Sequence, residues 1–261
     1  MNGQWDFAFD DENIGVLEGW SHTVRGDRKI NVPFTYETGK SGIGDERPHG
    51  VIWYWKNITI TNEFKKDQSI QINFEGCDYH LDLWVNGVYK GSHDGAYTRF
   101  AFELGKFAEG EEVLLSIRVE DPHSEEQVRG KQRWLSDNYG CWYVQTTGIW
   151  KDVWLEQVSD DYVEKIKITP DIYKKTVTIH TMCHSNKENL IMKSDVYFEG
   201  KFINSVSGKL EAGVCQMDID VYNKYVDLFV ITYKTAKSLD FTEIPAHSSN
   251  KLSAHLLSDH I

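Results

Sequence analysis

The chain has 261 residues, enough for one large domain or two ordinary ones. Hydrophobic residues make up 40% and aromatic residues 13%, which favours a packed globular protein over a disordered one. The net charge of −12 argues against nucleic acid and anionic membrane surfaces as partners, because phosphate groups attract positive charge. No apolar run approaches the length of a transmembrane helix and charges occur throughout residues 1–20, so we expect neither a membrane span nor a signal peptide.

Strand-like alternation begins at residues 3–9 (GQWDFAF) and recurs about every ten to fifteen residues, with turn-forming residues between. It continues over 51–60 and 69–76. The clearest case is 112–121, where every second residue is apolar: Val113, Leu115, Ile117 and Val119. Residues 148–158 follow. No stretch has a helical apolar period, so the sequence predicts an all-β sandwich or barrel.

A hairpin is predicted around Asn86-Gly87, the pair that best fits the two positive φ angles of a type I′ turn. The residues before the turn, 81–85, alternate between apolar and polar. The chain returns through residues 88–90 and is expected to open into a glycine-bounded loop over 91–98. A further strand then covers 100–104.

The amino-acid composition changes near residues 158–161, because all nine tryptophans lie at or before Trp154. New strands are predicted at 162–172, 175–183, 193–200, 214–221 and 226–234. These residues span the length of a small immunoglobulin-like sandwich. We therefore predict domains at 1–158 and 159–240, followed by an irregular tail over 241–261 rich in Ser and His.

Neither metals nor cofactors are expected. The four cysteines are widely spaced without a Cys-x-x-Cys pair, and the histidines of the tail lack tight ligand spacing: Cys77, Cys141, Cys183, Cys215, His247, His255 and His260. Buried thiols are typical of a reducing cytosol, so we expect a cytoplasmic bacterial protein. A trimmed N-terminus would leave a secreted or periplasmic location open.

Four stretches together resemble the N-terminal part of family 2 glycoside hydrolases, the group of β-galactosidases, β-glucuronidases and β-mannosidases. They are GVIWYWKNITI (50–60), FEGCDYHLDLWVNGVYKGSHDGAYTRFAFEL (74–104), RGKQRW (129–134) and TTGIWKDVWLE (146–156). The resemblance implies a jelly-roll sugar-binding domain over 1–158. By position and pattern, residues 160–240 resemble the family's immunoglobulin-like domain.

The resemblance also implies a (β/α)₈ barrel that carries two catalytic glutamates, an acid and a nucleophile about 5 Å apart. Such a barrel needs about 250 residues, whereas only 21 follow residue 240 (261 − 240). Adjacent acids such as Asp160-Asp161, Glu111-Glu112 and Glu125-Glu126 cannot replace that pair, because neighbouring strand residues face opposite ways. We therefore expect no catalytic residue within these 261 residues.

Sugar contact in this family comes from the loop before the GIW strand, where β-galactosidase-like and β-glucuronidase-like members place an aspartate six residues before the glycine. That position here is Trp142, which can stack on a sugar ring but cannot accept hydrogen bonds from its hydroxyls. The departure places galactose or glucuronate specificity and a cation site in doubt. Trp142 also fits a core or domain-interface aromatic.

The remaining candidates divide into two groups. Sugar-contacting candidates beside Trp142 are Asp137, Asn138, Tyr143 and Gln145. Rim or framework candidates are Arg129, Lys131, Gln132, His93, Asp94 and Tyr97. His93 and Asp94 could form an acid–base pair or a metal site, but the family carries a similar stretch as framework, which also covers Asp78 and Arg99.

The resemblance implies a non-catalytic portion of a β-glycosidase that shapes the substrate rim and packs on a barrel absent from these residues. Its partners would be a β-linked carbohydrate and that barrel, and the uncovered barrel-facing surface would favour homo-oligomers. Two alternatives stay open: a freestanding carbohydrate-binding module, and a scaffold or interaction protein that binds no sugar.

Overall fold

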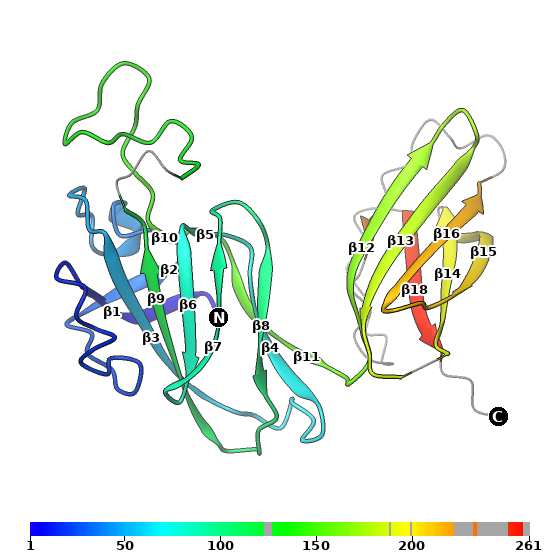
Figure 1. The fold of residues 1–261 in the computed structure, drawn as a ribbon, viewed down its shortest axis with the longest axis horizontal. Helices are drawn as coiled ribbons and strands as arrows, with labels where there is room; N and C mark the ends of the chain where they lie inside the picture. Colours follow the sequence, from blue (N-terminus) through cyan, green and yellow to red (C-terminus); the bar gives the residue numbers. More distant parts are fainter. Residues whose placement is uncertain (123–126, 188, 199, 222–231, 234–249, 258–261) are drawn as a thin grey trace. The chain divides into compact units, whose positions relative to one another are not determined.

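The computed structural model describes residues 1–122, 127–187, 189–198, 200–221, 232–233 and 250–257. The chain divides into two compact units, Met1–Gln157 and Val158–Ile261, next to the predicted boundary near residues 158–160. Each unit is built from strands, so the all-β prediction is confirmed (Figure 1). Within the described ranges, no helix is long and apolar enough to cross a membrane.

The larger layer of the first unit is a six-stranded sheet in the order β2-β1-β3-β9-β6-β7. Its strands are β1 (Gly3–Phe9), β2 (Arg28–Val32), β3 (Val51–Thr59), β6 (His80–Val85), β7 (Val88–Asp94) and β9 (Glu112–Glu120). All neighbouring pairs are antiparallel. The alternating residues of β9 are fully buried on one face, as the pattern predicted.

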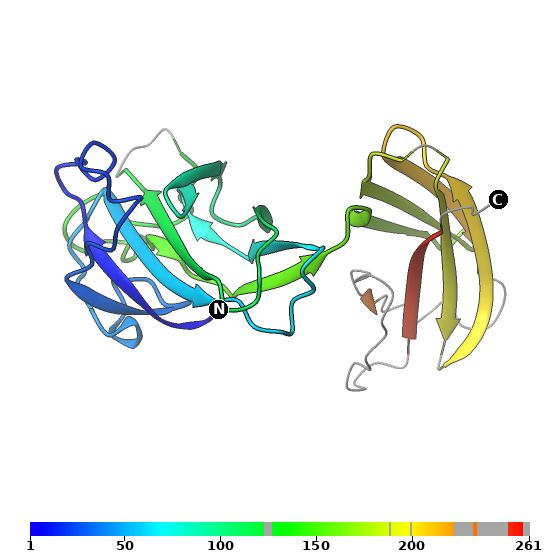
Figure 2. The same cartoon turned by 90° about the horizontal axis from the view of Figure 1, so that it is seen from below.

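The opposing layer consists of a sheet β11-β4-β8 and a short pair β10-β5 (Figure 2). These strands are β4 (Ser69–Phe74), β5 (Cys77–Asp78), β8 (Phe100–Gly105), β10 (Gly148–Ile149) and β11 (Val153–Val158). Apolar side chains from both layers meet in one core that includes Phe7, Tyr54, Ile72, Leu83 and Ile117. Residues 1–157 therefore form a β-sandwich.

Tryptophans cover the outer face of the six-stranded sheet. Trp53 stacks on Trp55 and on Trp84, with ring centroids 5.8 and 5.4 Å apart. The carboxylate of Asp10 accepts hydrogen bonds from the backbone N–H of Gly15 and from the indole N–H of Trp53, both at 2.9 Å. These aromatic residues therefore serve packing and leave little ring surface for a ligand.

The hairpin forms the predicted turn, because Asn86 and Gly87 both have positive φ angles, 49° and 79°. The predicted loop over 91–98 is wrong in its first half, since β7 continues to Asp94 and pairs His93 with Leu81. β7 is the edge strand of its sheet, and most of its side chains are exposed. An exposed edge strand has no apolar alternation to reveal it in the sequence.

The second unit contains two sheets, β12-β13-β16 and β15-β14-β18-β17. Their strands are β12 (Tyr162–Asp171), β13 (Thr176–His184), β14 (Ile191–Phe198), β15 (Lys201–Lys209), β16 (Val214–Asp220), β17 (Thr232–Tyr233) and β18 (Asn250–Leu257). Val177, Ile179 and Met217 from one sheet share a core with Met192 and Val196 from the other. Most of the predicted strand at 226–234 lies outside the described residues.

The prediction of an irregular tail over 241–261 is wrong for residues 250–257. They form β18, which pairs antiparallel with β14 along its whole length. Leu252, Ala254 and Leu256 alternate with polar residues in the sequence, a two-residue period that the Ser and His content conceals. His247 and His260 lie outside the described residues.

Candidate functional site

The segment between β9 and β10, residues 127–147, is a long loop that projects from the end of the sandwich near β5 and β10 (Figure 1). It carries all five sugar-contacting candidates. Backbone hydrogen bonds join its two arms, from Arg133 N to Tyr143 O at 2.6 Å and from Tyr143 N to Lys131 O at 2.9 Å. The loop is thus a folded projection with a defined tip.

Aromatic side chains gather on this loop. Trp134 packs edge-to-face on Trp142, with centroids 4.7 Å apart, and on Tyr139 at 5.4 Å. Trp142 is half-buried, whereas Trp134 is 40% and Tyr143 62% exposed. Trp142 therefore packs in an aromatic group whose most accessible ring is Trp134, and the exposed Tyr143 follows Trp142 in the chain. Trp134 was not singled out in the sequence, although it closes the RGKQRW stretch.

The polar candidates on the loop have different environments. Asp137 and Asn138 are both exposed, and Asn138 Oδ1 accepts a hydrogen bond from Arg133 Nη1 at 3.0 Å. Gln145 is buried, and its amide donates to the carbonyl oxygen of Glu46 at 3.0 Å. Gln145 consequently supports the loop, while Asp137 and Asn138 face solvent where a ligand can reach them.

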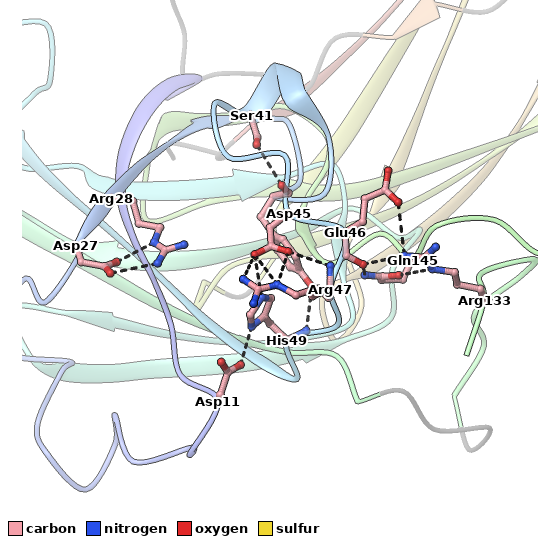
Figure 3. Close-up of polar contacts among 11 residues, drawn as sticks. Asp11, Asp27, Arg28, Ser41, Asp45, Glu46, Arg47, His49, Arg133 and Gln145 are labelled. Atoms are coloured by element: carbon pink, nitrogen blue, oxygen red, sulfur yellow. Dashed lines mark hydrogen bonds and ion pairs between the residues drawn. The ribbon is translucent and has the colours of Figure 1, made fainter. Parts of the chain in front are cut away.

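Arg133 is another residue that the sequence did not single out. It is 5% exposed and links three parts of the site (Figure 3). Its Nε donates to Gln145 Oε1 at 3.2 Å, and its Nη2 donates to the carbonyl oxygen of Glu46 at 2.8 Å. An arginine in a polar loop gives no sequence signal of burial, because most such residues are solvated.

The segment that supplies the Glu46 carbonyl is itself fastened by ion pairs (Figure 3). Asp45 pairs with Arg47 at 2.5 Å, and this guanidinium holds the pKa of the Asp45 carboxyl well below its usual range. His49 stacks on Phe9 with centroids 3.6 Å apart, and its Nδ1 lies 2.7 Å from Asp11 Oδ1. The sandwich thereby offers a fixed support for the loop.

Three buried carboxyl groups lie beneath the loop, and we call Glu37, Asp78 and Asp121 the acidic cluster. Burial raises the pKa of Glu37 to about 7 and that of Asp78 to about 7, and it also raises the pKa of Asp121. The charge of Asp121 adds to the rise at both other groups. None of the three is accessible enough to contact a sugar directly.

Two of the rim candidates on the loop contact other parts of the protein. Arg129 is buried and donates from Nη2 to the carbonyl oxygen of Arg133 at 2.9 Å. The Gln132 amide donates to Asp78 Oδ2 at 2.7 Å and accepts from the backbone N–H of Thr146 at 2.9 Å. Lys131 is exposed at the surface of the loop. Gln132 therefore joins both arms of the loop to the acidic cluster.

The side chains of His93 and Asp94, neighbours on β7, contact different groups. The His93 ring stacks on Phe100 at 3.8 Å, and its Nε2 lies 3.0 Å from Thr98 Oγ1. Asp94 pairs instead with His80 Nδ1 at 2.8 Å. The exposed Tyr97 packs edge-on against Trp150. These contacts fit a framework role for all three candidates.

The adjacent acids also have structural environments. Glu111 accepts a hydrogen bond from the backbone N–H of Ala108, and Asp161 pairs with Lys187 at 2.6 Å. Glu125-Glu126 lies outside the described residues. Over the described part of the chain, no group of three or more His, Cys, Asp or Glu side chains could hold a metal ion.

Curated relatives of the chain are bacterial β-glycosidases. It is 28% identical over 165 residues to a putative β-glucuronidase of Formosa agariphila, an alignment that covers 60% of this chain and 19% of that protein. It is 26% identical over 231 residues to a β-galactosidase of Thermoanaerobacterium thermosulfurigenes, covering 87% of this chain and 30% of that protein. The chain thus spans less than a third of the length of these two relatives.

Solved structures share the fold. A β-glucuronidase of Bifidobacterium dentium complexed with coumarin-3-O-glucuronide superposes with a TM-score of 0.67 at 17% identity, covering 84% of this chain and 40% of that one. A β-glucuronidase of Ruminococcus gnavus superposes with a TM-score of 0.62 at 15% identity, covering 86% and 39%.

The family assignment follows from the first unit. The family described as "Glycosyl hydrolases family 2, sugar binding domain" matches residues 1–159. This range includes both layers of the first β-sandwich and the whole 127–147 loop. The chain therefore belongs to glycosyl hydrolase family 2 and carries that family's N-terminal sugar binding domain.

Proposed function

We propose that these 261 residues are the non-catalytic N-terminal part of a β-glycosidase, and that the 127–147 loop contacts the glycoside at the rim of the active site. The observation that carries the proposal is the loop itself, because a sugar binding domain here projects Trp134 and Tyr143 from a firmly held support. Flat aromatic faces stack on sugar rings, and Asp137 and Asn138 supply polar contacts beside them.

The absence of catalysis in this portion is supported by the placement of its acids. Glycoside hydrolysis needs two accessible carboxyl groups on either side of the scissile bond. Glu37, Asp78 and Asp121 are buried beneath the loop, and the adjacent acids at 111 and 161 are tied into backbone contacts or ion pairs. The catalytic glutamates would come from a (β/α)₈ barrel that packs on these sandwiches.

The substrate proposed for the whole enzyme is a β-linked glycoside, in line with relatives named β-glucuronidase and β-galactosidase. Trp142 does not offer the hydrogen-bond acceptor that an aspartate at its position would provide. Stacking on the loop would therefore contribute more to recognition than a charged contact from position 142.

Two measurements test this proposal. The chain should not hydrolyse nitrophenyl β-glycosides, and protein-dependent release of nitrophenol would contradict a non-catalytic role. In a fusion of this chain to a family 2 barrel, Trp134→Ala should raise KM more than it lowers kcat, because it removes stacking that is made equally in the ground state and the transition state. Trp84→Ala on the outer sheet face is the matched control and should leave both constants unchanged.

A freestanding carbohydrate-binding module is the second candidate, and the exposure of Trp134 and Tyr143 favours it. It predicts measurable affinity of the isolated chain for oligosaccharides, lost on Trp134→Ala. Titration calorimetry against a panel of β-linked oligosaccharides separates the two candidates. Absence of binding together with a defined oligomer would favour a scaffold protein instead.

A further inference from the structure

The acidic cluster under the 127–147 loop has no role in the proposed sugar contact. Its carboxyl groups come from three separate places: Glu37 follows β2, Asp78 ends β5 and Asp121 follows β9. Their residues are 7%, 2% and 1% exposed. Ionised carboxylates are rarely buried to this degree unless something neutralises them.

The loop is attached to this cluster at both of its ends. At its beginning, the side-chain amides of Gln127 and Gln132 donate to Asp121 Oδ1 and Asp78 Oδ2. At its end, Thr147 Oγ1 donates to Asp121 Oδ2 at 2.7 Å. The positions of both arms therefore depend on two carboxyl groups below them.

Glu37 is the third member of the cluster. Both of its carboxylate oxygens are buried, and neither has a hydrogen-bond partner among the described residues. The hydroxyls of Thr35 and Thr147 are near enough to lower its pKa slightly, but burial outweighs them and raises it to about 7. A buried carboxyl without firm donors is most stable as the neutral acid.

The described groups around the acidic cluster carry less positive charge than three carboxylates would require. Arg129 is the cation that acts on Asp78 and Asp121. Tyr36, Tyr54 and Cys77 also face the cluster, and burial raises the pKa of each, so they stay uncharged. Among the described residues, one guanidinium therefore faces three carboxyl groups, and protonation of the carboxyls would lower the remaining negative charge.

We propose that Asp78 and Asp121 are positioning residues for the 127–147 loop, and that protonation of these two groups and of the neighbouring Glu37 controls how tightly the loop is held. Opening the loop would hydrate the carboxyls and return them to their ordinary pKa values near 4. The open state then binds fewer protons, so opening becomes easier as pH rises from about 4 to about 7 and changes little above that. The inference concerns the loop alone and holds whether or not the chain binds sugar.

Cys141 gives a natural reporter for this motion, because it is exposed on the loop while the other three cysteines are buried. A nitroxide attached to Cys141 should show a mobile spectral component that grows between pH 5 and pH 7. The opening constant should rise by up to about tenfold per pH unit for each carboxyl that becomes ionised, then level off by pH 8.

Single variants identify the groups responsible. Glu37→Gln, Asp78→Asn and Asp121→Asn should each flatten the pH profile, whereas Glu156→Gln, an equally buried glutamate on β11, should preserve it. Hydrogen exchange of peptides from 127–147 in the unsubstituted chain repeats the test without any substitution. Loop mobility that is independent of pH, profiles unchanged in all three variants, or equal flattening by Glu156→Gln would each overturn the proposal.

Discussion

At the scale of single residues, the interactions that organise the candidate site are those of buried polar groups. Arg133 connects Gln145, Asn138 and the Glu46 carbonyl, and these contacts pin the loop to the sandwich. Hydrogen bonds from a charged donor contribute about 1.5–3 kcal/mol, more than neutral ones. The loop's order therefore depends on one guanidinium more than on its exposed aromatic residues.

Arg133→Ala should lower the free energy of unfolding of the first unit by about 2–4 kcal/mol, since it leaves buried acceptors unsatisfied. Arg133→Lys should recover only part of the loss, because a lysine ammonium group cannot donate to the three acceptors that the planar guanidinium reaches. Urea titration followed by tryptophan fluorescence measures both. Lys131→Ala, an exposed cation on the same loop, should change stability by less than about 0.5 kcal/mol, and an equal loss there would refute the argument.

Glu37 also predicts how global stability depends on pH. A folded-state pKa raised from 4.5 to about 7 means that the unfolding free energy falls as pH rises through that window, by about 3 kcal/mol in all. Glu37→Gln should therefore stabilise the protein at pH 8 and have little effect at pH 4. Thermal unfolding at both pH values checks this, and equal effects at the two would contradict it.

The sequence predicted which residues the candidate loop contains, but not which of the polar side chains would be buried. Trp142, Tyr143, Asp137 and Asn138 share one loop as expected, whereas Gln145 proved to be a buried support. Arg133 and Glu37 could not have been identified, because each is buried by segments far away in the chain. Such tertiary burial leaves no trace in local spacing.

At the scale of elements, apolar alternation predicted the strands buried on one face and missed the others. β3, β4, β6 and β9 follow their patterns closely. β2 and β15 were not predicted and β7 was predicted too short, and most residues of these three edge strands are exposed or half-buried. β18 was missed although it lies inside its sheet, because its Ser and His content conceals the alternation. Elements whose side chains face solvent are therefore best recognised from turn residues and backbone pairing.

The β6–β7 turn allows a clean test of steric fit. A Cβ on Gly87 would lie 2.0 Å from His22 Nδ1, while one on Gly110 would meet nothing within 4 Å, and both residues have φ near +80°. Gly87→Ala should therefore cost more than Gly110→Ala, which carries the backbone strain alone, about 1 kcal/mol. Chemical denaturation of the pair measures the difference, and equal losses would show that His22 moves aside freely.

At the scale of the whole molecule, the chain contains two units with separate buried cores. All nine tryptophans belong to residues 1–157, so indole fluorescence reports the first unit alone. The family assignment rests on this same unit, while the second contributes strands without the motifs that identify the family.

Unfolding should therefore differ between two spectroscopic probes. Tryptophan fluorescence should follow the first unit, and far-UV circular dichroism should follow both, giving midpoints in guanidinium that do not coincide. A fragment of residues 1–157 should reproduce the fluorescence transition of the full chain within about 0.5 kcal/mol. Coincident transitions in the full chain, with a shifted transition in the fragment, would show instead that the units unfold as one.

The place of β18 has a practical consequence for anyone shortening this polypeptide. β18 sits between β14 and β17 in its sheet, so a recombinant product ending at residue 240 would strip β14 of one neighbour along its full length. Backbone N–H and C=O groups that are left unpaired at a strand edge can pair with strands of other molecules, and the protein then aggregates on expression. A product that retains the chain through Leu257 should therefore stay monodisperse, whereas one that ends at residue 240 should aggregate.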